Sequence, residues 1–288
     1  MSTPMSNLIT PDALNTLIVS GASVRLLDVR WRLDQPDGRA DHAAAHLPGA
    51  VYVDLDSELA QHGDPSEGRH PVPSHEQLQD AARRWGLRNG DVVVAYDDNG
   101  SVAAARAWWL LRRTGVSIRV LDGGLGAWRA AGLPVESGDV TPAAGDVVLE
   151  ASLEGEMSID EAAGLPGHGV LLDVRVAERY RGETEPVDPI AGHIPGAINL
   201  PAAGNIAADG TLQGLEALRA SFASVGVEPS TEVAAYCGSG VNAAHTALAL
   251  AEIGIDAKLY SGSWSAWSNT PGRPVATGAE PDGEAAAQ

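Results

Sequence analysis

The sequence of 288 residues contains a single cysteine, Cys237. One cysteine excludes an internal disulfide framework, which is typical of a reducing compartment, so we expect a cytoplasmic protein. No apolar run reaches the ~18 residues of a membrane span. The N-terminal residues also lack the basic start and the apolar stretch of a secretory signal. The sequence therefore predicts neither a membrane-spanning protein nor a disulfide-rich secreted one.

Basic residues are few, because 19 Lys and Arg stand against 38 Asp and Glu, which gives a formal net charge of −19. Nucleic acids and anionic membranes bind basic surfaces, so we expect neither as a partner. The charge mainly keeps the protein soluble. An anionic substrate would need local positive groups in order to bind against this repulsive field.

The chain repeats itself once, because four short motifs recur in the same order. They occupy residues 26–30 and 171–175, 46–51 and 193–198, 93–97 and 233–237, and 122–128 and 261–267. Each copy alternates short apolar runs with helical patterns, which predicts a parallel sheet covered by helices. We therefore expect an α/β protein with similar domains at residues 7–135 and 157–276. Residues 136–156 are expected to form a linker, and residues 277–288 a disordered tail.

Individual elements can be assigned in the first copy. We expect strands at Val24–Val29, Ala50–Val53, Val92–Ala95 and Ile118–Val120, and helices at Pro11–Val19, His75–Trp85 and Val102–Arg113. Ligands of such sheets bind beyond the carboxyl ends of the strands. Cys237 lies at such an end in the second copy, whereas its counterpart in the first copy is Asp97. This difference predicts one working site and one inactive scaffold.

Cys237 opens a loop of small residues, Gly238-Ser239-Gly240, ahead of a helical run rich in Ala and Leu. The backbone N–H groups of the loop and the helix dipole favour a thiolate, and Ser239 can donate a hydrogen bond or relay a proton. The alternative is an inert buried thiol. A cysteine phosphatase would place Arg six positions after the nucleophile, where Ala243 stands. Sulfur transfer is therefore favoured over phosphoryl transfer.

The tandem Leu-Asp-Val-Arg and His-x-Pro-Gly-Ala motifs, with Cys-Gly-Ser-Gly-Val in the second copy only, resemble two-domain rhodaneses from about Leu8 to Pro274. The cysteine loop is most similar to that of 3-mercaptopyruvate sulfurtransferases. The resemblance implies two tandem rhodanese-like domains, each with a five-stranded parallel sheet, and a persulfide cycle without cofactor or metal. In this cycle the cysteine takes a sulfane sulfur from a small anionic donor. It passes the sulfur to a thiol or cyanide, and a thioredoxin-like protein is a candidate acceptor.

The resemblance also implies roles for the residues of the loop. Cys237 is the nucleophile and the persulfide carrier. The backbone N–H groups from Gly238 through Gly240 to Val241 stabilise the sulfur and line the donor site. Asn242 stands where the family usually has Thr, and both side chains can form hydrogen bonds.

Residues outside the loop follow from the same resemblance. Arg179 matches the residue that binds the carboxylate or sulfonate of the donor, and Arg181 is a second candidate. Mercaptopyruvate enzymes usually place another Arg before the His-Ile-Pro-Gly segment. Val187–Ile190 has none, which leaves thiosulfate open as the donor. Asp56 and His70 match a pair in the first domain that reaches Ser239 and forms a proton relay for departing pyruvate.

Two remaining expectations concern metals and catalysis. His42 and His46 are four residues apart, as zinc ligands can be, but no third ligand lies nearby and we expect no metal site. The sequence predicts a sulfurtransferase that uses 3-mercaptopyruvate, with thiosulfate sulfurtransferase as the alternative enzyme. A non-catalytic rhodanese module that binds or senses a partner is the alternative from another class.

Overall fold

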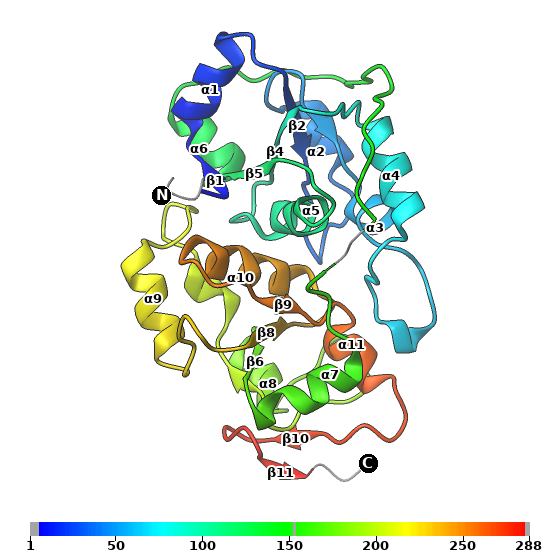
Figure 1. Cartoon of the computed structure of the whole chain (residues 1–288), viewed down its shortest axis with the longest axis vertical. Helices are drawn as coiled ribbons and strands as arrows, with labels where there is room; N and C mark the ends of the chain where they lie inside the picture. Colours follow the sequence, from blue (N-terminus) through cyan, green and yellow to red (C-terminus); the bar gives the residue numbers. More distant parts are fainter. Residues whose placement is uncertain (1–5, 152–153, 286–288) are drawn as a thin grey trace. The chain divides into compact units, whose positions relative to one another are not determined.

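The computed structural model of the chain describes residues 6–151 and 154–285 and divides into two compact units (Figure 1). The first unit holds the chain up to Gln61, Val72–Glu154 and Ile206–Leu212. The second holds His62–Pro71, Gly155–Asn205 and the chain from Gln213 onward. Over the described residues, no helix combines the length and the apolar character needed to cross a membrane.

In the described part of the chain, the first unit contains a five-stranded parallel sheet in the order β1-β5-β4-β2-β3 (Figure 1). Its strands are β1 (Leu8–Ile9), β2 (Val24–Asp28), β3 (Val51–Tyr52), β4 (Val92–Tyr96) and β5 (Ile118–Leu121). Its helices are α1 (Pro11–Val19), α2 (Arg39–Ala44), α3 (Leu55–Glu58), α4 (His75–Arg84), α5 (Val102–Arg112) and α6 (Gly124–Ala130). Helix α5, which follows β4, packs against β4 and β5.

All elements expected in the first copy are present, and their ends shift by at most one residue. Helix α1 has the expected bounds because the Thr10 side chain accepts from the Ala13 N–H at 3.3 Å and Pro11 occupies the first turn. The sequence did not predict β1, α2, α3 and α6. These elements are too short for a periodic pattern to identify them.

The second unit contains a four-stranded parallel sheet, over the described residues, in the order β7-β6-β8-β9. Its strands are β6 (Val170–Asp173), β7 (Ile198–Asn199), β8 (Val233–Tyr236) and β9 (Lys258–Leu259). Its helices are α7 (Ile159–Gly164), α8 (Ala177–Tyr180), α9 (Leu215–Ala223), α10 (Val241–Glu252) and α11 (Ser263–Ser268), with 3-10 turns η1 (Pro65–Glu67), η2 (Leu165–Gly167) and η3 (Ala202–Asn205). The segment that contains η1 packs on α11.

The expectation of five strands in each domain is wrong for the second sheet. The position equivalent to β1 is a single parallel bridge between Glu156 and Leu259. The Met157 N–H donates to the Leu259 carbonyl at 2.9 Å, and the pairing then ends. Pairing stops there because Ser158 caps α7, accepting from the Glu161 N–H at 3.3 Å and turning the chain into a helix.

The segments expected to be a linker and a disordered tail carry ordered contacts. Val147 and Leu149 are buried, and their backbones bond to Gln79 of α4. Two short antiparallel strands, β10 (Ala276–Thr277) and β11 (Glu284–Ala285), form beyond the second sheet. Composition favoured disorder from residue 277, but backbone pairing orders the chain as far as residue 285. Residues 152–153 and 286–288 lie outside the described residues.

The repeat builds the same core in each unit. Equivalent motif positions lie in two separate cores. The first core contains Leu26, Leu47, Tyr96, Leu125 and Trp128. The second contains their counterparts Leu171, Ile194, Tyr236, Trp264 and Trp267. The tyrosines also make the same hydrogen bond, because the hydroxyls of Tyr96 and Tyr236 each accept a backbone N–H at 3.1 Å. The repeated motifs therefore encode one packing arrangement twice.

Candidate active site

Cys237 lies directly after β8 and is 2% exposed. The loop turns into α10 at Gly240, whose φ of 85° is a left-handed conformation that suits glycine. This turn aims the Gly240 N–H at the Cys237 sulfur, to which it donates at 3.1 Å. The Cys237 N–H in turn donates to the Ser263 hydroxyl at 3.1 Å. The sulfur is therefore held at a strand end by a hydrogen bond from an amide of its own loop.

Ser239 lies two residues after the cysteine and contacts His70. The Ser239 hydroxyl and the His70 Nδ1 atom are 2.8 Å apart, and both residues are buried. His70 belongs to the His62–Pro71 segment of the second unit, so this contact is internal to that unit. The structure thus brings together two of the predicted site residues.

Asp56 lies in the first unit, at the start of α3. Its Oδ1 atom accepts a hydrogen bond from the Trp31 indole N–H at 2.9 Å. The indole therefore holds one carboxylate oxygen of Asp56, and its place in a proton relay stays a prediction.

Arg179, on α8, is held by two acidic residues. Its Nε and Nη2 atoms donate to the Glu185 carboxylate at 3.1 and 2.6 Å, and Nη2 also lies 3.2 Å from Asp188 Oδ2. A Cβ atom added to Gly238 would lie 3.4 Å from Arg179 Nη1. The guanidinium predicted to bind the donor therefore lies against Gly238, the residue that follows Cys237.

Arg69 also reaches the cysteine loop, although the sequence did not predict it as a site residue. A Cβ atom on Gly238 would lie 3.0 Å from Arg69 Nη2, and Arg69 Nη1 donates to Asp188 Oδ1. Burial raises the pKa of Asp188, whereas the arginines Arg69 and Arg179 lower it in part. The only signal in the sequence was the position of Arg69 directly before His70.

A cavity of about 370 Å³ opens beside this cluster and lies within the second unit. Arg69 and Asp188 line it, together with Ser265 of α11. The Ser265 N–H donates to the Gly238 carbonyl at 2.9 Å, which joins the wall of the cavity to the cysteine loop. The cavity offers room for a small molecule next to Arg69.

Other predicted site residues lie in different surroundings. Arg181 donates to Glu183 at 2.7 and 2.9 Å, and so pairs with an acid of its own segment. The side chain of Val241 is buried at the start of α10, and that of Asn242 is exposed. These contacts join Arg181 to acidic side chains rather than to the cysteine loop.

The first copy has the same loop position with a carboxylate in place of sulfur. The Asp97 and Cys237 carbonyls accept equivalent bonds, from the N–H groups of Leu125 and Trp264, each at 2.9 Å. The Asp97 carboxylate accepts four backbone N–H groups between 2.8 and 3.0 Å, from Asn99, Ser101, Ala103 and Ala104. Burial raises the pKa of Asp97 above its ordinary value. The nest of amides is therefore present, but its occupant cannot carry sulfur.

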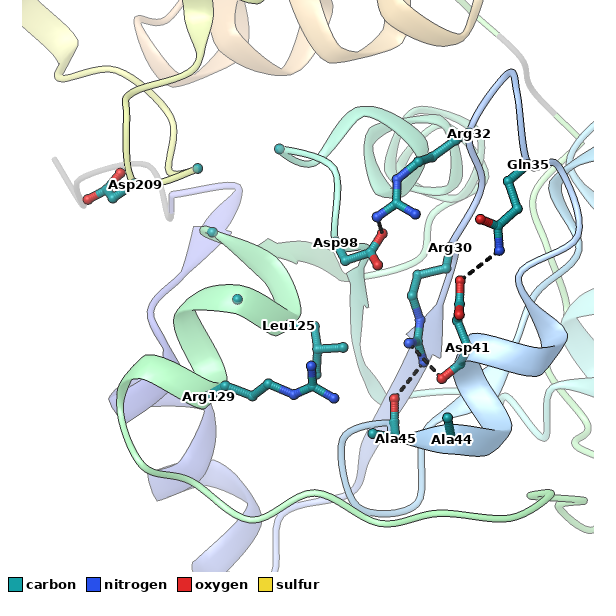
Figure 2. Close-up of a pocket in the computed structure, with 14 residues that line it drawn as sticks. Arg30, Arg32, Gln35, Asp41, Ala44, Ala45, Asp98, Leu125, Arg129 and Asp209 are labelled. Atoms are coloured by element: carbon teal, nitrogen blue, oxygen red, sulfur yellow. Dashed lines mark hydrogen bonds and ion pairs between the residues drawn. The ribbon is translucent and has the colours of Figure 1, made fainter.

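A cavity of about 580 Å³ lies next to this loop in the first unit (Figure 2). Asp98, which follows Asp97 as Gly238 follows Cys237, forms an ion pair with Arg32 at 2.8 Å. Figure 2 shows both side chains at the pocket, with Arg129 extending from the opposite wall. The carboxylate of Asp98 is thus paired with an arginine that lines the same pocket.

The histidines of the repeated motif have structural surroundings. His46 Nδ1 lies 2.8 Å from the His42 carbonyl, and His193 Nδ1 lies 2.8 Å from the Tyr180 carbonyl. His42 Nδ1 faces the Asp28 carboxylate at 2.9 Å. Within residues 6–151 and 154–285, no group of three or more His, Cys, Asp or Glu side chains is arranged to hold a metal ion.

Comparison with known proteins agrees with this geometry. The model of the rhodanese-like domain matches residues 10–131 and again residues 158–270. The chain belongs to the rhodanese family. A Mycobacterium tuberculosis relative, provisionally named as the thiosulfate sulfurtransferase SseB, is 50% identical over 94% of this chain and 97% of its own length. A Pseudomonas aeruginosa relative, provisionally named as a 3-mercaptopyruvate sulfurtransferase, is 41% identical over 90% and 94%.

Solved structures lead to the same family. The 3-mercaptopyruvate sulfurtransferase SseA from Escherichia coli matches with a TM-score of 0.79 and 29% identity, covering 90% of this chain and 99% of that one. The 3-mercaptopyruvate sulfurtransferase from Leishmania major matches with a TM-score of 0.80 and 28% identity, covering 92% and 74%. This rhodanese is therefore a sulfurtransferase enzyme with two tandem domains.

Proposed function

We propose that this rhodanese takes sulfur from 3-mercaptopyruvate and carries it as a persulfide on Cys237. The observation that carries the proposal is the 2.8 Å contact between Ser239 and His70, two residues from the nucleophile in the loop. Pyruvate leaves as an enolate that needs a proton, whereas thiosulfate releases sulfite, which needs none. A hydroxyl paired with an imidazole is suited to deliver that proton.

In the first half-reaction, the Cys237 thiolate attacks the sulfur of the donor. An S–S bond forms, the C–S bond of the donor breaks, and its electron pair goes to carbon as the enolate of pyruvate. The proton of the donor thiol reaches the enolate carbon by way of Ser239 and His70. The products are pyruvate and a Cys237 persulfide anion. The Gly240 N–H, 3.1 Å from the sulfur, supports the negative charge in the resting thiolate.

In the second half-reaction, an acceptor thiolate or cyanide attacks the outer sulfur. The S–S bond breaks, and its electron pair returns to Cys237 as the thiolate. A thioredoxin-like protein is the proposed physiological class of thiol acceptor. Asp56 is the proposed third member of the proton relay, after Ser239 and His70. We expect the Asp56→Asn variant to release pyruvate more slowly.

Thiosulfate is the second candidate donor, for two reasons. The relative from Mycobacterium tuberculosis carries a thiosulfate name at 50% identity. The Val187–Ile190 segment also lacks the Arg expected of a mercaptopyruvate enzyme. Against this candidate, the Ser239–His70 pair would have no proton to deliver.

The test compares both donors in one assay. Purified protein is mixed with cyanide and either mercaptopyruvate or thiosulfate, and thiocyanate is followed alongside Cys237→Ser. We expect sustained thiocyanate and pyruvate with mercaptopyruvate, and none from the variant. Turnover with thiosulfate alone would replace the proposed donor. Intact-mass analysis that shows one added sulfur atom without sustained product would instead indicate a sensor module.

A further inference from the structure

The cavity of about 580 Å³ in the first unit is the counterpart, in the repeat, of the cavity beside the cysteine loop. Asp41 lines the first cavity and Asp188 the second, each five residues before the histidine of its motif. Gly126 and Ser265 also line the two cavities, each two residues before the last tryptophan of its motif. The first unit has therefore kept a pocket at this place, although its loop cannot carry sulfur.

Charged side chains of both signs line this pocket, and most of them have partners within the first unit. Arg30 donates to the Asp28 carboxylate at 2.9 Å and to two backbone carbonyls at 2.8 Å. The Asp41 carboxylate accepts from the Gln35 amide at 2.9 Å. Asp209 accepts from the hydroxyl and the N–H two residues later, at 2.6 and 3.1 Å. These groups need no ligand to satisfy them.

Arg129 is the exception among the cations. It lies in the last turn of α6 and is exposed. Figure 2 shows its side chain extending into the pocket from the wall opposite Arg32 and Asp98, with no hydrogen bond or ion pair to the other residues drawn. A guanidinium carries five N–H donors in a planar fork that suits an anion. The pocket therefore offers one cation to a ligand.

Asp98 is the exception among the acids. Arg32 Nη2 lies 2.8 Å from its Oδ1 atom, but Oδ1 is buried and has no hydrogen-bond partner in the described part of the chain. The two side chains are thus paired by charge, whereas the lone pairs of this oxygen stay unfilled. A buried acceptor without a donor is unfavourable, so a ligand that donates a hydrogen bond to Oδ1 gains free energy.

The surroundings of Asp98 favour a neutral O–H donor over an ammonium. Arg32 already lies against this carboxylate. Burial acts to lower the pKa of Arg30, but Asp28 and, more weakly, Asp98 raise it above its ordinary value. Asp98 therefore acts on both guanidiniums. An ammonium bound to Oδ1 would be repelled by them, whereas a hydroxyl would not.

We propose that the pocket of the first unit binds a small anion that carries its own O–H group, such as hydrogen phosphate or a 2-hydroxy carboxylate. The anionic oxygens accept from Arg129, and the O–H donates to Asp98 Oδ1. Each side chain then gains the partner that the unit does not supply. The site is independent of the sulfur donor, because all of its lining residues belong to the first unit.

The test titrates the full chain by calorimetry with two pairs of anions. Phosphate and sulfate are both tetrahedral, but only phosphate carries an O–H group at neutral pH. Lactate and pyruvate have the same charge, and lactate has a hydroxyl where pyruvate has a carbonyl. We expect phosphate or lactate to bind about tenfold more tightly than its partner, as for one hydrogen bond to a charged group. The pair that shows the preference identifies the class of ligand, and equal affinities within both pairs would overturn the proposal.

Arg129→Gln assigns the binding to this pocket, because arginines of the second unit also attract anions. We expect the affinity for the preferred anion to fall by about tenfold. Arg219→Gln is the matched control, since it removes another exposed helical arginine, on α9, and should leave the titration unchanged. Parental affinity in Arg129→Gln would place the anion elsewhere and refute the site.

Asp98→Asn tests how the pocket selects its ligand. An amide can accept from an O–H or donate to an anionic oxygen, so the preference within each pair should fall towards one. An unchanged preference would refute the role of Asp98. If that variant does not fold, Gly126→Leu tests the pocket instead, because a Cβ atom there meets no atom within 4 Å and the backbone is not left-handed. Its side chain should fill the pocket and abolish binding, and retained binding would refute the site.

Discussion

Gly238→Ala should separate donor binding from folding. The added Cβ would lie 3.0 Å from Arg69 Nη2, closer than ordinary contact, so the tip of that side chain must withdraw by a few tenths of an ångström. It would only just touch Arg179 Nη1, at 3.4 Å. The methyl group would also fill the space that the two guanidiniums face. Gly238 is not in the left-handed region, so alanine fits its backbone without strain.

The expected magnitudes for Gly238→Ala follow from these contacts. Loss of one charge-assisted hydrogen bond costs about 1.5–3 kcal/mol, which lowers kcat/KM for mercaptopyruvate by about 10- to 150-fold. The free energy of unfolding should stay the same or rise by about 0.4–1 kcal/mol, because alanine restricts the unfolded chain. Steady-state kinetics and urea unfolding measure the two quantities.

Gly204→Ala is the matched control, because a Cβ atom there meets no atom within 4 Å and Gly204 is outside the left-handed region. It should leave kcat/KM unchanged. Parental kcat/KM in a stable Gly238→Ala variant would refute donor binding at the arginines beside Gly238. A loss of stability in Gly238→Ala as large as its loss of activity would refute the geometry derived for the loop.

Three further changes test other parts of the site. Ser239→Ala should lower kcat with mercaptopyruvate by about 100-fold, because it removes the hydroxyl that pairs with His70 in the proton relay. Turnover of thiosulfate should fall less, since sulfite needs no proton. Equal losses with both donors would contradict the relay. Gly240→Ala places a side chain at φ 85° at a cost of about 1–2 kcal/mol and should slow alkylation of Cys237 by iodoacetamide. Burial raises the pKa of Asp97 in the folded protein above its ordinary value of 3.8. The folded state therefore binds this proton more tightly than the unfolded state, and the free energy of unfolding falls as pH rises from 3.8 through the raised pKa. The unfolding free energy of Asp97→Asn relative to the parent should therefore increase with pH over that range, and a flat difference would contradict the shift.

The sequence predicted the residues that depend on local pattern. Cys237 could be identified because it is the single cysteine of the chain and follows a strand motif that occurs twice. Asp97 could be identified because it follows the first copy of the same motif. The pairing of Ser239 with His70 required the family resemblance, since 169 residues separate them. Arg69 was missed because its partner Asp188 is 119 residues away and neither belongs to a periodic pattern.

The segment Val187–Ile190 shows why absence of a residue type is weak evidence. Its lack of arginine counted against a mercaptopyruvate site. The structure shows instead that its acidic residue, Asp188, contacts an arginine from residues 62–71. An arginine from another segment thus lies beside the cysteine loop, and only the tertiary structure reveals this neighbour.

The loops of the two copies differ at two adjacent positions, because Asp97-Asp98 in the first stands where the second has Cys237-Gly238. In the first unit, Asp98 follows the nucleophile position and its carboxylate pairs with Arg32 at 2.8 Å. In the second, Gly238 has no side chain, and unused nitrogens of Arg69 and Arg179 face the space that remains. A thiol at position 97 would therefore still lie beside an internal carboxylate that competes with any anionic donor. We therefore expect that Asp97→Cys alone would not give the first unit sulfur-transfer activity, because Asp98 would remain directly beside the new thiol.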